Sequence, residues 1–329
     1  MPVTDHARLS VAPMMDWTDR HCRAFHRVLS RQVLLYTEMV TSAALVRGGA
    51  VELLEFDAAE HPVALQLGGS DPAELAEATA MAVARGYAEV NLNVGCPSDR
   101  VQSGCFGAIL MERPGLVADC VAAMIAAAGD VPVTVKCRIG VDDQDPATVL
   151  PDFLSRIRDA GVSRATIHAR KAWLQGLSPK ENREVPPLDY ALVHAMAERF
   201  DDMHLSINGG IASLDDVGAQ LEPMDGVMVG RAAYHDPAAI LLEADSRIFG
   251  TADPCPDRAT AALRMLPHLE RHIDGGGKPG HVTRHMLGLF AGLPGARAWR
   301  RTLSEGAARP GAGAEILTEA LAHVTAQAA

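Results

Sequence analysis

Two amides, a thiol and a proline follow one another closely in the stretch Asn91-Leu92-Asn93-Val94-Gly95-Cys96-Pro97. The alternating apolar residues predict a strand, so the side chains of Asn91 and Asn93 point to the same side of it. Buried amides need hydrogen-bond partners, and polar groups are therefore expected opposite them. An isolated cysteine is usually a small buried apolar residue. Because Cys96 follows two aligned amides and precedes Pro97, which ends strand pairing, we consider it a candidate for chemistry.

Polar side chains also interrupt other apolar stretches that we expect to form buried strands, which are normally almost continuously apolar. Taken singly, each is equally compatible with a satisfied buried polar residue or with a loop residue. The active site of a parallel-stranded barrel lies at the C-terminal ends of its strands, and these side chains fall near such ends. Together they predict one shared rim, formed by Gln66, Asn91, Asn93, Cys96, Lys136, Arg138, His168, Asn208 and Arg231.

Two glycine motifs close the last two expected strands, Asn208-Gly209-Gly210-Ile211 and Gly230-Arg231-Ala232. Glycines let backbone N–H groups approach phosphate oxygens, and Arg231 adds a charged donor. Either motif alone is compatible with an ordinary turn. Both together, after strands seven and eight of a barrel, favour a phosphate-binding site.

The remaining chain predicts the elements that would position these residues. Apolar runs predict strands over 9–14, 34–40, 62–69, 88–94, 132–140, 164–170, 204–211 and 226–234. Amphipathic stretches predict helices over 16–28 with Thr18 as N-cap, 72–84 with Asp71 as N-cap, 114–128, 150–160, 188–200 and 214–220. Strands alternating with helices, eight in number, are typical of a (β/α)₈ barrel. A doubly wound open sheet is the alternative, but no Gly-x-Gly-x-x-Gly follows the first strand.

The pattern changes after residue 245. Helices are expected over 259–273, 281–289 and 314–326, separated by glycine-rich breaks and without strand signals. We therefore predict two domains, a catalytic barrel over 1–245 and a smaller all-helical domain over 246–329.

Charge is distributed unevenly along the chain. The formal net charge is −11, yet residues 258–309 carry nine Lys and Arg against three acidic residues. A basic segment on an acidic protein is typical of a localised footprint for a polyanion, although a helical surface that merely carries arginines gives the same count.

Other features limit the class of protein. No apolar run is long enough to span a membrane, no signal peptide is recognisable, and the six cysteines lack Cys-x-x-Cys spacing. Reduced thiols in a cytoplasmic protein are the simplest interpretation. Scattered histidines without ligand spacing argue against a metal site, and no Gly-x-Ser-x-Gly indicates a serine hydrolase.

A family resemblance joins these motifs. The chain resembles the tRNA-dihydrouridine synthases in Ala-Pro-Met-Met at 12–15, Gln66, Asn-x-Asn-x-Gly-Cys-Pro at 91–97, Lys136, His168, Asn-Gly-Gly-Ile at 208–211 and Gly-Arg at 230–231. The stretches 16–23, 171–177 and 178–183 are similar to the A-type branch of that family. The resemblance covers essentially the whole chain, including the helical tail.

The resemblance implies an enzyme that uses FMN and NADPH to reduce uridine in the D-loop of tRNA, at positions 20 and 20a for the A-type branch. Hydride would pass from N5 of FMN to C6 of uracil, and Cys96 would supply the proton to C5. An ordinary thiol suits that role because it is mostly protonated at neutral pH. By the same resemblance, Asn93 would hold the uracil.

The resemblance also assigns the cofactor site. Lys136 would lie beside the anionic edge of the flavin. His168, Asn208, Gly209, Gly210, Gly230 and Arg231 would hold the phosphate. Gln66 would bond the isoalloxazine ring, against which Pro13, Met14 and Met15 would pack. We expect tRNA phosphates at Lys180, Arg183, Arg297 and Arg300, with Arg301 beside them, and no obligate protein partner.

Two other classes of function remain open at this point. A flavin barrel that acts on a small molecule, such as a dihydroorotate-type dehydrogenase, shares the phosphate motifs but does not explain the basic tail. A nonredox RNA-binding protein explains the tail but not Cys96, Lys136 and His168 together.

Overall fold

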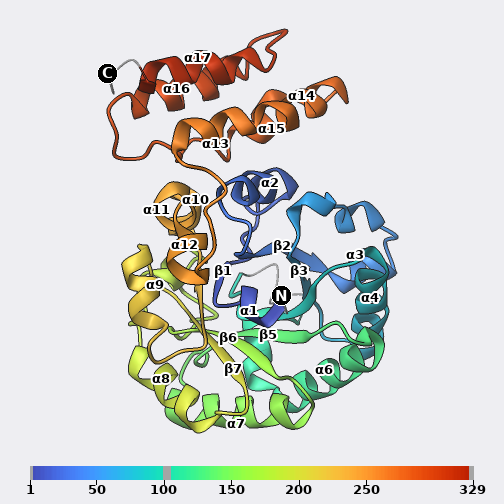
Figure 1. Ribbon diagram of the computed structural model, residues 1–329. Coiled ribbons are helices and arrows are strands. Elements are labelled where there is room, and N and C mark those ends of the chain that lie inside the picture. The colour runs from blue at the N-terminus through green and yellow to red at the C-terminus, as the bar shows by residue number, and fades with distance from the viewer. Residues whose placement is uncertain (1–2, 99–104, 326–329) are drawn as a thin grey trace.

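The strands of this protein form a closed parallel barrel in sequential order, as Figure 1 shows. The computed structural model describes residues 3–98 and 105–325. The barrel strands are β1 (Leu9–Val11), β2 (Leu34–Thr41), β3 (Val63–Gly68), β4 (Glu89–Val94), β5 (Val133–Arg138), β6 (Arg164–His168), β7 (His204–Asn208) and β8 (Gly226–Val229). Every expected strand is present, and the predicted (β/α)₈ barrel is confirmed.

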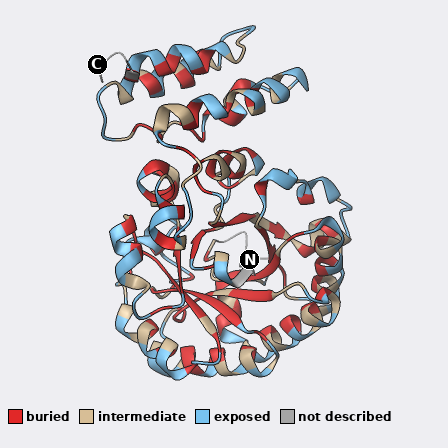
Figure 2. Cartoon of the chain, in the orientation of Figure 1, coloured by how far each residue is buried: buried red, intermediate tan, exposed pale blue. Residues whose placement is uncertain are grey.

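Helices surround the barrel and bury their inner faces against it (Figure 2). The longer ones are α2 (Arg20–Leu29), α4 (Pro72–Arg85), α6 (Pro114–Ala128), α7 (Pro146–Asp159), α8 (Tyr190–Arg199) and α9 (Leu214–Gln220). Shorter helices are α1 (Val3–His6), α3 (Ser42–Val46), α10 (Arg231–His235), α11 (Pro237–Leu241) and α12 (Ala244–Phe249). The 3₁₀ helices are η1 (Val51–Leu54), η2 (Ala58–Glu60), η3 (Gly107–Glu112) and η4 (Glu181–Arg183).

Local sequence explains most helix boundaries. The Asp71 side chain accepts the Glu74 N–H and Pro72 occupies the first turn, as predicted, while Gly86 ends α4 with φ 86°. Helix α7 begins four residues before its expected start because Asp145 caps it and Pro146 opens it.

Two further boundaries in the barrel differ from their predictions. Asp19 rather than Thr18 caps α2, since its carboxylate accepts the N–H groups of His21 and Cys22. The Thr18 hydroxyl is instead bonded to the backbone of Met14. Strand β8 ends at Val229 rather than at 234, because the backbone turns at Gly230 into the short helix α10.

The barrel interior has an apolar half and a polar half. Leu34, Tyr36, Ala64 and Met228 pack in one apolar cluster. Cross-strand pairing places Gln66 beside Asn91, Asn91 beside Thr134, and Asn93 beside Lys136. The alternation along β4 thus brings its polar side chains to one side of the strand, as its sequence pattern predicts.

The C-terminal helices lie together outside the barrel (Figure 1). They are α13 (Arg258–Arg264), α14 (Leu266–Asp274), α15 (Pro279–Thr283), α16 (Ala296–Gly306) and α17 (Glu315–Thr325). The helix expected over 259–273 is divided near Met265, and the one expected over 281–289 ends at Thr283. Helix α16 was not predicted. It is anchored by Trp299, whose side chain is fully buried and donates to the Met286 carbonyl at 3.0 Å.

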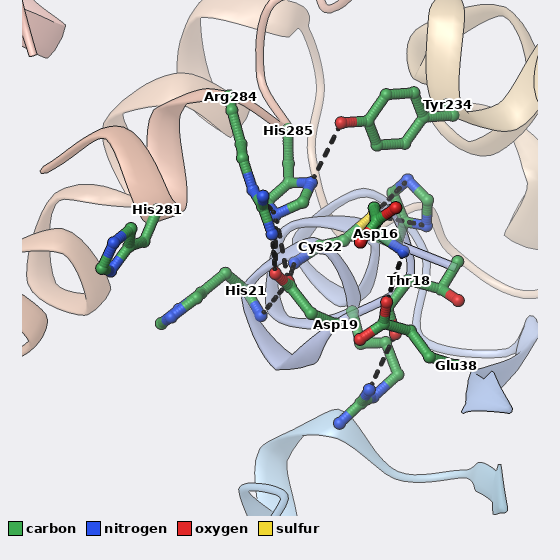
Figure 3. A network of polar contacts seen from close by, with 12 residues as sticks. Asp16, Thr18, Asp19, His21, Cys22, Glu38, Tyr234, His281, Arg284 and His285 are labelled. Atoms are coloured by element: carbon green, nitrogen blue, oxygen red, sulfur yellow. Dashed lines mark hydrogen bonds and ion pairs between the residues drawn. The ribbon is translucent and has the colours of Figure 1, made fainter. Parts of the chain in front are cut away.

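Asp19 joins the helical part to the barrel (Figure 3). Besides capping α2, its carboxylate lies 2.5 Å from Arg284 Nη2 and 3.0 Å from His285 Nε2. The other ring nitrogen of His285 lies 3.2 Å from the Tyr234 hydroxyl. These contacts and burial act in opposite directions on the pKa of Asp19, and the net effect holds it well below its usual value.

The predicted boundary between the two domains, at 245/246, stays a prediction. The structure shows which element occupies that position. Helix α12 runs through that position to Phe249. The buried Asp245 carboxylate accepts the N–H groups of Arg31 and Gln32 at 2.8 and 3.2 Å, so α12 is tied to the barrel. Over the described ranges, no helix combines the length and apolarity needed to cross a membrane.

Candidate active site

Cys96 lies in a loop that the preceding strand holds by hydrogen bonds. The Asn93 side-chain oxygen accepts the N–H groups of Gly95 at 3.1 Å and of Cys96 at 3.0 Å. The thiol is partly exposed, is not in a disulfide, and lies 3.5 Å from the Ser98 hydroxyl. Asn93 therefore fixes the backbone that carries the thiol.

The polar partners expected for Asn91 and Asn93 are present. Gln66 on the neighbouring strand donates to the Asn91 oxygen at 2.8 Å and accepts from the Asn93 nitrogen at 2.8 Å. All three side chains are buried. Gln66 thus bonds both amides, and its role toward a flavin ring stays a prediction.

Arg138 connects the Cys96 loop to the loop after β6. Its Nε donates to the Gly95 carbonyl at 2.9 Å, and its Nη1 donates to the carbonyls of Lys171 and Asn182, each at 2.9 Å. Buried Asn182 in turn bonds the backbone N–H and carbonyl of Trp173. Arg138 was placed on the rim from sequence but given no role, although its spacing of two from Lys136 puts both on one side of β5.

Positive charge accumulates at this rim. Among the described residues, no acidic side chain forms a salt bridge with Lys136, Arg138, Arg170 or Arg183. Burial, followed by the nearby Arg138 guanidinium, lowers the pKa of Lys136 to about 8. An anionic ligand would remove this electrostatic cost, so the rim favours an anion.

His168 shares that environment. Burial holds its pKa well below the usual value, and the charges of Arg138 and Lys136 act in the same direction. In the described part of the chain, His168 Nδ1 and Arg170 Nε are buried without a hydrogen-bond partner. Unpaired buried polar atoms are rare in proteins, and here they indicate that a ligand completes the site. Arg170 was not singled out by its sequence.

The glycines after β7 lie where any side chain would collide with neighbouring residues. A Cβ on Gly209, whose φ is 113°, would lie 3.3 Å from His168 Nε2. A Cβ on Gly210, whose φ is 75°, would lie 2.6 Å from a methyl carbon of Leu188. The Asn208 side chain donates to the Met228 carbonyl at 2.7 Å and joins the ends of β7 and β8.

The loop after β1 reaches the same region. A Cβ on Gly230 would still have 3.8 Å to the sulfur of Met14, so Met14 borders the last glycine motif. Pro13 is partly buried, and Met15 is 55% exposed. Packing of these residues on a flavin stays a prediction.

Arg231 has an acidic partner that its sequence context did not reveal. Its Nη1 lies 2.5 Å from Glu184 Oε1, and the two side chains are 39% and 45% exposed. An exposed ion pair of this kind contributes little stability, so it would compete only weakly with a phosphate.

The basic residues predicted for tRNA fall into two groups. Lys180 and Arg183 are exposed on the loop after β6, which Arg138 holds beside Cys96. Arg297, Arg300 and Arg301 are exposed on α16. The structure thus brings only the first group to the rim, and the shared RNA face stays a prediction.

A hollow of about 800 Å³ lies elsewhere, between α2, η1, η2 and α14. Its charges are balanced, because Arg20, Arg85 and Arg271 line it together with Glu55, Asp57 and Glu60, and Arg20 pairs with Glu55. Burial lowers the pKa of His21, which lines the hollow, to about 3. The hollow is therefore less suited to an anion than the rim.

The fold and the rim together describe a (β/α)₈ barrel with unpaired positive side chains beside a cysteine loop. The chain matches the profile of the family described as Dihydrouridine synthase (Dus) over residues 10–326. The chain therefore belongs to the dihydrouridine synthase family, and the resemblance seen in its sequence is confirmed.

Individual relatives agree with this assignment. A protein of Vibrio cholerae serotype O1 named tRNA-dihydrouridine(20/20a) synthase is 54% identical over 326 residues, which cover 99% of each chain. The Escherichia coli K12 protein of that name is 57% identical over 315 residues, which cover 95% of this chain and 90% of that protein.

Similarity to solved structures concerns the fold alone. An old yellow enzyme homologue from Zymomonas mobilis aligns with a TM-score of 0.52 at 13% identity, covering 70% of this chain and 86% of that one. A structure titled TcOYE with pHBA aligns with a TM-score of 0.54 at 12% identity, covering 76% and 91%.

Proposed function

We propose that this protein reduces the C5=C6 bond of uridine to 5,6-dihydrouridine in the tRNA D-loop, with bound FMN and with NADPH as reductant. The observation that carries the proposal is the unpaired positive rim beside the Cys96 loop, in a member of the dihydrouridine synthase family. Relatives at 54% and 57% identity are named for positions 20 and 20a, and we assign those uridines on that ground.

The residues present fit a flavin mononucleotide. His168 and Arg170 offer unpaired nitrogens to the phosphate, and the backbone N–H groups of Gly209 and Gly210 are further donors beside them. Arg231 can join them by leaving Glu184. Lys136 supplies a positive charge for the anionic edge of the ring. When bound, FMN would carry a hydride from NADPH to C6 of uracil.

Cys96 supplies the proton in this proposal. The uracil ring gains a proton at C5 when it accepts hydride at C6, and the thiol of Cys96 donates it and is later reprotonated from solvent. Asn93 uses one N–H on Gln66 and keeps its second N–H for a uracil carbonyl. Because Asn93 also bonds the Cys96 backbone, substrate and acid are held by one side chain.

FMN affinity should decrease as pH rises above about 8. The pKa of Lys136 lies near 8, below its ordinary value, so the free protein loses this positive charge there. An anion favours the protonated form, so the Kd should be nearly constant from pH 7 to 7.5 and then rise by up to about tenfold per pH unit. Fluorescence titration of the apoprotein with FMN between pH 7 and 9.5 measures this.

The matched variant Lys136→Met should bind FMN more weakly and with a flat pH profile over that range. If wild type and variant share one profile and one flavin reduction potential, Lys136 is a structural residue only.

The substrate assignment is tested by mapping dihydrouridine in tRNA from cells with and without this gene. Loss of the modification at positions 20 and 20a, restored by the wild-type gene, is the expected result. An unchanged map would refute the proposed function. The cytoplasm, where tRNA and NADPH meet, is the proposed location.

A further inference from the structure

A chain of buried hydrogen bonds runs inside the barrel from the start of β4 to the Cys96 loop. It begins at Glu89, whose side chain is fully buried. Glu89 Oε1 accepts from the hydroxyls of Tyr36, at 2.6 Å, and Thr134. The links that follow are Asn91 Nδ2 to Thr134 Oγ1, Gln66 Nε2 to Asn91 Oδ1, and Asn93 Nδ2 to Gln66 Oε1, each 2.8 Å.

The carboxylate at the start gives this chain a direction. An ionised carboxylate only accepts hydrogen bonds, and a threonine hydroxyl has a single hydrogen to donate. Thr134 gives that hydrogen to Glu89, so toward Asn91 it can only accept. The NH₂ group of Asn91 must therefore face Thr134, and its carbonyl oxygen must face Gln66.

The same constraint passes along the remaining amides. The NH₂ group of Gln66 faces the Asn91 oxygen, so its own oxygen faces Asn93. The NH₂ group of Asn93 then faces Gln66, and its oxygen meets the backbone N–H groups of Gly95 and Cys96. Those N–H groups cannot accept, so both ends of the chain require one and the same orientation.

Arg164 keeps the carboxylate in place. It forms an ion pair with Glu89 Oε2, and the two side chains are 5% and 0% exposed. Removing one partner of such a buried pair leaves an uncompensated charge, which is costly, so both partners are needed together.

We propose that Glu89 is a positioning residue for Cys96. Its charge fixes the orientation of Asn91, Gln66 and Asn93, and the last of these holds the backbone that carries the thiol. This inference rests on the proposed role of Cys96 as the acid, but the loop geometry can be measured without it.

Glu89→Gln should reverse the chain. Arg164 only donates, so the new amide must turn its oxygen to Arg164 and its NH₂ group to Thr134. Thr134 would then donate to Asn91, and every amide would flip in turn. At the far end the NH₂ group of Asn93 would face the N–H groups of Gly95 and Cys96, and the loop would lose its acceptor.

The first measurement separates the two half-reactions in the FMN-loaded protein. Reduction of the flavin by NADPH should change far less than reoxidation in Glu89→Gln, because the turn of Gln66 alters a single expected contact with the flavin ring. Reoxidation by tRNA in a single turnover should slow by about 10- to 100-fold, the usual cost of a misplaced reacting group. Equal slowing of both half-reactions would overturn the proposal.

The second measurement does not depend on activity. Alkylation of Cys96 by iodoacetamide, quantified on its peptide by mass spectrometry, should accelerate by about 5- to 30-fold, the factor that two ordinary hydrogen bonds supply. If wild type makes no dihydrouridine, the proposed function fails, but this rate still decides the loop inference. An unchanged alkylation rate would overturn the inference alone.

Tyr36→Phe is the matched control. It also removes a buried hydrogen bond to Glu89, but it leaves the direction of the chain intact. Both rates should stay within about twofold of wild type, since one lost hydroxyl should not affect the distant loop.

Combining Glu89→Gln with Thr134→Val provides a rescue test. Without the hydroxyl the reversal cannot reach Asn91, so the double variant should alkylate more slowly than Glu89→Gln alone. Additive acceleration would overturn the proposal. Should Glu89→Gln not fold, Thr134→Val alone takes its place, because it preserves the ion pair and still interrupts the chain of hydrogen bonds. Rates identical to those of Tyr36→Phe would then refute the proposal.

Discussion

Cys96→Ala is expected to bind FMN and to be reduced by NADPH at the wild-type rate, yet to lose turnover on tRNA by about 10²–10⁴-fold. That range is the usual contribution of a general acid. The thiol is needed only when C5 of uracil takes up its proton, so the flavin's reaction with NADPH should not depend on it. Stopped-flow reduction and single-turnover dihydrouridine formation measure the two steps separately.

Cys105→Ala supplies the control for that substitution. Cys105 is exposed and follows the same part of the chain, so it tests the loss of a nearby thiol. We expect both steps to remain at wild-type rates in this variant. Full tRNA turnover by Cys96→Ala would remove Cys96 from the mechanism and leave another proton donor to be found.

Features that depend on residue spacing could be predicted from the sequence. The period of two along β4 placed Asn91 and Asn93 on one side, and the structure places Gln66 and Thr134 against them. The number of alternating strands and helices predicted the barrel. Asp71-Pro72 predicted the start of α4 because a cap and a first-turn proline act locally.

Features that depend on partners distant in sequence could not be predicted. Glu89 looks like an ordinary acidic residue at the start of a strand, and only the fold brings Arg164 and Thr134 to it. Asp19, which caps α2 in place of Thr18, also bonds Arg284 from the helical part, a contact absent from any local pattern. The turn of the chain at Gly230 likewise shortened β8.

Partners distant in sequence also decide which charged side chains are neutralised, and this could not be predicted. Arg231 was expected to be free for phosphate, but the loop after β6 brings Glu184 to it. Arg170 gained importance only because the fold leaves its Nε buried without a partner among the described residues. A sequence gives the number of charges, whereas the fold decides which of them neutralise one another.

Replacing Lys180, Arg183 and Arg300 together by Ala should weaken tRNA binding and flatten its salt dependence by about two to three units, if each residue holds one phosphate. The side chains are exposed, so the fold should tolerate the change. Phosphate contacts release counterions, and each one lost lowers the slope of log K against log salt by about 0.7–0.9. Binding of labelled tRNA over a series of salt concentrations gives that slope.

The control for this prediction removes the same charge from the outer helices of the barrel. Arg85, Arg156 and Arg199 lie on the outer helices α4, α7 and α8, are exposed, and can be replaced by Ala together. Both triple variants change the net charge equally, so a long-range field would weaken tRNA binding in both. If the residues contact tRNA directly, the slope of log K against log salt decreases only in the Lys180, Arg183 and Arg300 variant.

NADPH oxidation with a small artificial acceptor should be unaffected in both variants, because it needs the flavin site only. If the first variant retains the wild-type affinity and slope, the loop after β6 and helix α16 do not form the RNA face, and the helical part must serve another purpose.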